Sequence, residues 1–148
     1  MIRLPMIGLL VLLLAAVAGA VRADDGKPPL TPEQRMQARF PQNVRVGDVI
    51  GLPLVDDSHS TLGFVREFAR RTDGKLELVI GYGGIFSYLG WHFRAVAAPI
   101  EVVCIRGREL ASLDMSRREY AAAPTWRHDG STTLAPDTTI RLALCRGY

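Results

Sequence analysis

The stretch Leu76–Pro99, LELVIGYGGIFSYLGWHFRAVAAP, decides how this chain folds. Its apolar residues Leu76, Leu78 and Ile80 alternate with their neighbours, so they share one face of an extended strand. Glycines follow at once, and glycine suits a place where a strand bends sharply or another backbone comes close. A phosphate-binding loop would need a helix after these glycines, and no helical pattern follows them. The stretch therefore predicts a strand, a turn and a second strand, with the turn built on Gly81, Gly83, Gly84 and Gly90.

Aromatic residues crowd this turn: five of the eleven in the chain fall within twelve positions. The rings either close the end of a small core or stay exposed as anchors for a partner, because Tyr and Trp join a large apolar area to a polar tip. The second interpretation makes the turn the best candidate for a binding surface. Its residues are Tyr82, Phe86, Tyr88, Trp91 and Phe93.

The first 23 residues are typical of a secretory signal peptide. Arg3 gives a charged start, an apolar run extends to Val21, and Ala23 is a small residue before the expected cleavage site. The alternative is an uncleaved N-terminal membrane anchor, because the run is near the lower limit for spanning a bilayer. We expect a periplasmic or secreted protein, cleaved after Ala23.

The composition fits one small exported domain. Removal of the expected leader leaves 125 residues, the size of a single domain. The full chain has a net charge of +3, but the leader carries Arg3 and Arg22, so 16 basic and 15 acidic residues remain. The sequence contains no block of five like charges. We therefore expect no nucleic-acid partner.

A short helix is expected at the start of the exported part. Thr31 would cap it, Pro32 suits its first position and Gln34 completes a capping box. Pro41 ends it by Phe40, which leaves the helix too short to be stable without packing on the rest of the domain.

Two strands are expected before the central stretch. Alternating apolar residues and two glycines predict a bent strand at 44–55. A second strand at 62–71 would place on one face Leu62, Phe64 and Phe68. The turn Asp73-Gly74 joins it to the central strand, because Asp-Gly is favoured where two successive residues need positive φ. The three strands would form a meander.

Shorter elements follow the central stretch. Extended segments are expected at 94–106, with an interruption at Pro99, at 109–113 and at 138–145. Ser116 and Glu119 predict a second capping box and a helical turn that Pro124 stops. Many short strands and few helical residues favour an all-β fold: a small, partly closed β-barrel with short flanking helical turns and a C-terminal strand.

Several short motifs stand in order between Val46 and Met115. They are Val46-Gly47-Asp48-Val49-Ile50-Gly51, Gly63-Phe64-Val65, Asp73-Gly74, the run from Val79 to Phe86, Leu89-Gly90 and Val96-Ala97-Ala98-Pro99. In this order they resemble the PRC-barrel domains, a family named for the cytoplasmic domain of the photosynthetic reaction-centre H subunit. The resemblance implies a compact β-barrel used for assembly and docking, with no shared catalytic residues to carry over.

The chain also departs from the family pattern at three places. Ser58-His59-Ser60-Thr61 stands where the family commonly has an acidic-glycine turn, Glu67 stands where it has an aspartate, and the loop at 85–90 is longer. With this resemblance the chain divides into four parts. They are a signal peptide at 1–23, a linker and short helix at 24–43, a PRC-barrel-like domain at 44–126, and a loop with a C-terminal strand packed on the barrel at 127–148.

Cys104 and Cys145 are the only cysteines, and both belong to the part expected to be exported. An even pair in an oxidising compartment favours a disulfide over free thiols. If their strands lie side by side, both sulfurs fall on the outer face, away from the apolar residues of each strand. A redox-active or intermolecular thiol is the alternative, but no Cys-x-x-Cys spacing is present.

The histidines and serines form no catalytic or metal-binding pattern. His59, His92 and His128 are scattered through expected loops without an i, i+4 pair, so we expect neither a metal nor another cofactor. In Ser58-His59-Ser60 serine stands beside histidine, but adjacent residues point apart and no glycine-flanked nucleophile turn is present. We therefore expect no enzymatic activity.

These observations lead to a non-catalytic docking module of the bacterial envelope that contacts a protein partner through the turn Tyr82–Phe93. A barrel that encloses a small hydrophobic ligand is one alternative, and a hydrolase centred on His59 is another. Basic residues near two hairpin ends are typical of a solvated surface that protects strand edges, with weak contact to anionic lipid as the alternative. They are Arg66, Arg70, Arg71 and Lys75 at one end and Arg106, Arg108, Arg117 and Arg118 near the other.

Overall fold

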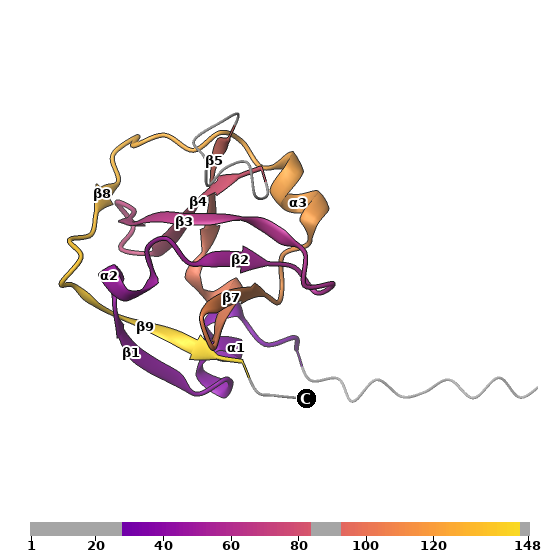
Figure 1. Ribbon diagram of the computed structural model, residues 1–148. Coiled ribbons are helices and arrows are strands. Elements are labelled where there is room, and N and C mark those ends of the chain that lie inside the picture. The colour runs from indigo at the N-terminus through magenta and orange to yellow at the C-terminus, as the bar shows by residue number, and fades with distance from the viewer. Residues whose placement is uncertain (1–27, 84–92, 146–148) are drawn as a thin grey trace, which may run out of the picture.

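Strands dominate the fold, as Figure 1 shows for the computed structural model, which describes residues 28–83 and 93–145. The elements within these residues are α1 (Pro32–Ala38), β1 (Pro41–Arg45), α2 (Val46–Val49), β2 (Pro53–Val55), β3 (Thr61–Arg70), β4 (Leu76–Tyr82), β5 (Arg94–Pro99), the 3-10 turn η2 (Ile100–Val102), β6 (Val103–Arg106), β7 (Glu109–Ser112), α3 (Arg117–Ala122), β8 (Thr132–Thr133) and β9 (Thr139–Leu144). The expectation of a β-rich fold with short helices is confirmed.

The signal peptide predicted at 1–23 lies outside the described residues. In the described part of the chain, no helix combines the length and the hydropathy that crossing a membrane requires.

The described strands belong to one mixed sheet. Hydrogen bonds join them in the order β1-β9-β6-β7-β2-β3-β4-β5, and β8 pairs with β3 beside this path. The expected meander is present, since β2, β3, β4 and β5 each run antiparallel to the next. Two pairings are parallel, β2 with β7 and β6 with β9. Among the described strands the path ends at β1 and β5 without joining them, so the sheet is open and does not form the partly closed barrel that we predicted.

One hydrophobic core lies inside the curl of this open sheet. Residues of β2, β3, β4, β5, β6, β7 and β9 enter the same cluster, together with residues of α2 and α3. A flat sheet could not bring its distant strands to one cluster, so the sheet must twist and curl around it. Figure 1 shows β1 and β9 on the opposite side of the interior from β4 and β5. Side chains fill this interior, the largest fully buried ones being Tyr120 and Phe68.

The segment predicted as one bent strand at 44–55 is instead β1, a helical turn and β2. Val46 donates its backbone N–H to the carbonyl of Thr138, and Gly47 donates to Pro136, which turns the chain here. The helical turn α2 places both Val46 and Val49 in the core. Residues three apart share a face in a helix but not in a strand, and this spacing explains the correction.

β3 contains two irregularities that change which residues face the core. Its pairing shifts opposite Leu54 and Val55 of β2, and again between Val65 and Glu67. The prediction that Phe64 shares the core face with Leu62 and Phe68 is therefore wrong. The buried residues are Leu62, Val65 and Phe68, whereas Phe64 is half-buried. A bulge adds one residue and so moves the alternation to the other face.

Glycines set the geometry at both ends of the hairpin of β3 and β4. A Cβ atom on Gly63 would lie 2.2 Å from the carbonyl oxygen of Gly81, so the two backbones can approach this closely only at glycine. At the turn, Gly74 has a φ of +84° and donates its N–H to Arg71. Asp73 does not have positive φ. The turn therefore contains one left-handed glycine, not the predicted pair of positive-φ residues.

Cys104 and Cys145 form the expected disulfide, with their Cα atoms 5.1 Å apart. It joins β6 to the residue after β9, and these strands run parallel. The two sulfurs lie on the face of the sheet away from the main core, as expected, but this face is covered. Cys104 is fully buried in a second small cluster that includes Met36 of α1. The short helix is thus stabilised by packing over the disulfide.

Candidate functional site

Only the two ends of the turn expected to bind a partner are described. Tyr82, the last residue of β4, is half-buried against the core. Phe93, just before β5, has 42% of its surface exposed. The remaining residues of the turn, Phe86, Tyr88, Trp91, Gly84 and Gly90, lie outside the described residues. One described ring therefore closes the core, and the other lies at the surface.

Two arginines lie over these two rings. The Cζ atom of Arg66 is 4.6 Å from the centre of the Phe93 ring, and that of Arg94 is 5.7 Å from the centre of the Tyr82 ring. The negative face of an aromatic ring attracts a cation, by about 0.5–1 kcal/mol at an exposed site. Gly81 makes room, because a Cβ atom there would lie 3.0 Å from Nε of Arg66 and 3.2 Å from Cδ2 of Phe93. We define Arg66, Gly81 and Phe93 as the aromatic–arginine surface.

Arg94 also holds α3 beside this surface. Its guanidinium donates to the carbonyl oxygens of Tyr120, at 3.0 Å, Ala121, at 2.8 Å, and Ala123. Carbonyls at the C-terminal end of a helix have no partner within it and carry partial negative charge, so a cation is favourable there. No local pattern in the sequence predicts this role of Arg94. Arg94 lies opposite Tyr82 in the pairing of β4 with β5, and this neighbour can be identified only when the strand register is known.

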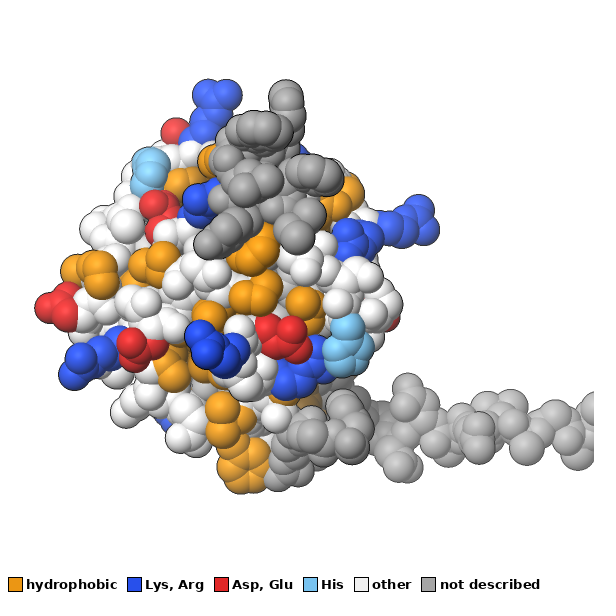
Figure 2. Space-filling view, in the orientation of Figure 1, with side chains coloured by type: hydrophobic (Ala, Val, Ile, Leu, Met, Phe, Trp, Pro, Cys, Tyr) orange, Lys and Arg blue, Asp and Glu red, His pale blue; other side chains and the backbone are white. Residues whose placement is uncertain are grey.

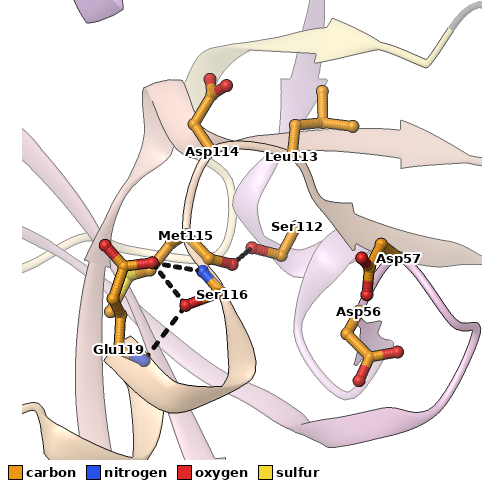
Figure 3. A pocket seen from close by; sticks show the side chains of 8 residues that line it. All are labelled: Asp56, Asp57, Ser112, Leu113, Asp114, Met115, Ser116 and Glu119. Carbon is orange, nitrogen blue, oxygen red and sulfur yellow. Dashed lines mark hydrogen bonds between the residues drawn. The ribbon is translucent and has the colours of Figure 1, made fainter.

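A second candidate site is an acidic hollow of about 260 Å³ beside α3. Figure 3 shows the residues that line it, Asp56, Asp57, Ser112, Leu113, Asp114, Met115, Ser116 and Glu119. The carboxylates point in different directions and do not meet at one point (Figure 3). Among residues 28–83 and 93–145, no three His, Cys, Asp or Glu side chains gather as a metal site would require.

Asp56 is buried and ties the turn between β2 and β3 to α3. Its Oδ1 accepts hydrogen bonds from the backbone N–H of Ser58 and Ser60 and from the Ser58 hydroxyl, and its Oδ2 accepts one from Arg117 at 2.8 Å. Burial raises the pKa of a carboxyl, but here the hydrogen bonds from Ser58, Ser60 and Arg117 and the charge of Arg117 outweigh it and lower the pKa of Asp56 to about 2. This carboxylate therefore anchors the turn between β2 and β3 to α3.

Other polar groups of the hollow are paired in the same way. Asp114 accepts two hydrogen bonds from Arg39, at 2.8 and 3.2 Å, and Arg35 lies 3.3 Å away. The bond from Arg39 is the main reason that the pKa of Asp114 is lowered, against the effect of burial. Glu119 and Ser116 form the predicted capping box of α3. These groups join α1, α3 and the turn between β2 and β3, and they hold the fold together.

The serine–histidine arrangement considered for a hydrolase is not formed. Ser58 donates its hydroxyl to Asp56 at 2.7 Å, whereas Nδ1 of His59 lies 2.9 Å from the guanidinium of Arg106. His59 itself has a φ of +61°, which turns it away from the course of a strand. His92 lies outside the described residues, and Nε2 of His128 lies 3.5 Å from Glu67 in another part of the molecule.

The viewed face of the molecule mixes its charges. Figure 2 shows acidic and basic side chains interspersed, with hydrophobic side chains between them.

No family model matches this chain, and no curated protein sequence matches it. The support for the candidate sites therefore comes from the distances, burial and contacts of their residues.

Proposed function

We propose that this protein is a non-catalytic docking domain of the bacterial envelope, and that it binds a protein partner through the aromatic–arginine surface. One observation carries the proposal: Phe93 is 42% exposed and Arg66 lies over its ring. Aromatic residues and arginine are enriched in protein interfaces, where they account for much of the binding energy. The half-buried Tyr82 and Arg94 fix the base of this surface on the core and on α3.

The disulfide supports the envelope location. A bonded cysteine pair fits an extracellular or periplasmic protein, because cytosolic thiols are kept reduced. The N-terminal apolar run supports export by a signal peptide that is cleaved after Ala23. A protein without a reaction of its own acts there through what it binds.

The resemblance to PRC-barrel domains also supports a docking role, since that family serves assembly. The proposal does not require a closed barrel, because the surface lies at one end of β4 and β5 only. A hydrophobic ligand inside the sheet has less support. Side chains as large as Phe68 and Tyr120 already fill the interior.

Photo-crosslinking in the native host tests this function. A photoreactive phenylalanine at position 93 should capture one partner protein. The same residue at position 113 should not, although Leu113 is 43% exposed and so matches Phe93 in accessibility. The captured partner, once purified, should bind Phe93→Ala at least about tenfold more weakly than the unchanged protein.

Matched substitutions complete this test. Leu113→Ala should keep the affinity within about twofold, since most interface-remote surface positions are neutral. Tyr88→Ala and Trp91→Ala extend the same measurement to the rest of the turn. Equal affinity of Phe93→Ala and Leu113→Ala would contradict the proposed function, as would identical crosslinks from both positions.

A further inference from the structure

β1 and β5 are the first and last strands in the order of the sheet, and their outward backbone groups are covered to different extents. At β5 the carbonyl of Ala95 accepts the N–H of Trp126, and Pro99 has no N–H to offer. At the other end, among the strands within residues 28–83 and 93–145, β1 pairs with β9 alone. In Figure 1 β1 lies at the outer side of β9, with no other described strand beyond it. The side chains of Gln42, Asn43 and Arg45 on β1 are exposed.

The register of β1 determines which of its backbone groups are open. Val46 donates its N–H to Thr138 across the ladder at 3.0 Å, one step beyond the end of β1. Bonded and non-bonded pairs alternate in an antiparallel ladder, so Val44 also bonds to β9. Asn43 and Arg45 then turn their N–H groups away from β9. An added strand is held by main-chain groups of this kind.

The outer face beside this edge is basic. Asn43 is paired with Arg141 of β9, so their side chains share a face, and Arg45 shares it because it is two residues from Asn43. Among the described residues neither arginine forms an ion pair. A shallow hollow of about 520 Å³ adjoins them, lined by Pro41, Gln42, Asn43 and Arg141.

We propose that the open edge of β1 is a docking site for an extended acidic segment of a protein partner. The segment adds to the sheet as a further strand, and carboxylates on its outer face meet Arg45 and Arg141. This site is separate from the aromatic–arginine surface, and it does not depend on that surface. A second copy of this chain fits less well, because pairing two such edges would place four arginines on one face and oppose like charges.

A synthetic peptide of alternating Glu and Val, capped at both ends, is the probe. Its comparison peptide has Gln at each Glu position. With the intact, disulfide-bonded protein, we expect the Glu peptide to bind at least about tenfold more tightly at low salt, because charge-assisted hydrogen bonds are the stronger ones. The difference should shrink as salt is added. Hydrogen exchange at the amides of Asn43 and Arg45 should slow when the Glu peptide is bound.

Two pairs of variants separate the backbone and charge contributions. Asn43→Pro removes an outward N–H without removing a bond to β9, and an edge strand tolerates proline, so the Glu peptide should no longer bind. Asn43→Ala keeps that N–H and should bind within about twofold of the unchanged protein. Arg141→Glu should weaken Glu-peptide binding by at least about tenfold. Arg118→Glu, at an exposed arginine of α3, is the matched control and should not.

Three results would overturn the assignment. The first is equal binding of the Glu and Gln peptides. The second is unchanged binding by Asn43→Pro or, if that variant does not fold, by Arg45→Glu with Arg141→Glu. The third is dimerisation of the protein that Asn43→Pro abolishes, since it would give the edge to a second copy of the chain.

Discussion

Gly63 lies where β3 comes closest to β4, and its hydrogen side chain is required by sterics. A Cβ atom at position 63 would lie 2.2 Å from the carbonyl oxygen of Gly81. This oxygen belongs to the backbone, so it cannot rotate away as a side chain could. Gly63→Ala should therefore lower the free energy of unfolding by about 3 kcal/mol, the upper range for overpacking. Urea denaturation followed by circular dichroism measures this loss.

Gly74→Ala is the control for this prediction. Gly74 also needs its special conformation, with a φ of +84°, but an added Cβ would meet nothing within 4 Å. Its cost should be the left-handed penalty alone, about 1 kcal/mol. Equal losses in the two variants would show that close approach is not what Gly63 provides.

Asp56 makes the free energy of unfolding depend on pH in the acid range. Its pKa is lowered in the folded state from 3.8 to about 2, so its stabilisation is complete above the unfolded value and is lost as the pH falls from about 4 to 2. The shift corresponds to about 2 kcal/mol. Asp56→Asn should lose about that much at neutral pH, and its unfolding free energy should fall less steeply in acid. Thermal melts across this pH range measure both effects.

Asp57→Asn is the matched control, since Asp57 is the exposed neighbour of the buried Asp56. It should leave the free energy of unfolding at neutral pH within about 0.5 kcal/mol of that of the unchanged protein. An Asp57 variant that loses as much as Asp56→Asn would place the anchor in the wrong carboxylate.

At the scale of elements, the disulfide closes a long loop. Its cysteines are 41 residues apart in sequence, which in the chain-entropy model stabilises the fold by about 4 kcal/mol. The double variant Cys104→Ala with Cys145→Ala should therefore unfold at much lower urea concentration. Reductant should lower the midpoint of the unchanged protein and leave that of the double variant where it is. Equal sensitivity to reductant would contradict the prediction.

The sequence predicted those features that depend on interactions between residues close together in the chain. Thr31 and Gln34 form the capping box of α1, Ser116 and Glu119 form that of α3, and Gly74 marks the hairpin turn. These features depend on neighbours within a few residues. They were predictable because the partners are visible in one short stretch of sequence.

Contacts between distant segments were not predictable in this way. The turn at Val46 needs the carbonyl of Thr138, and Asp56 needs Arg117, each partner being far along the chain. The bulge in β3 reverses the face of Phe64 without any sign in the apolar pattern. Within the candidate binding turn, the sequence identified Phe93 because it is one of the clustered aromatic residues. The arginine over it, Arg66, was interpreted only as a solvated charge.

At the scale of the whole molecule, one core should make unfolding a single event. Tyr120 of α3 and Phe68 of β3 belong to the same cluster as strands from most of the sheet. With the disulfide intact, loss of secondary structure and change in tryptophan fluorescence should follow one urea transition with the same midpoint. Two separate midpoints would show that α3 or the β1–β9 pair unfolds independently of the rest.

The position of β9 in the sheet determines when the fold can be completed during synthesis. It lies between β1 and β6, although it is the last strand of the described chain. Until residues 139–144 leave the ribosome, β1 has no neighbour to bond with and Cys104 has no partner sulfur. The fold of a nascent chain therefore stays incomplete until residues 139–145 have been made. During this delay the strands already made expose apolar faces and unpaired edges, which favours aggregation.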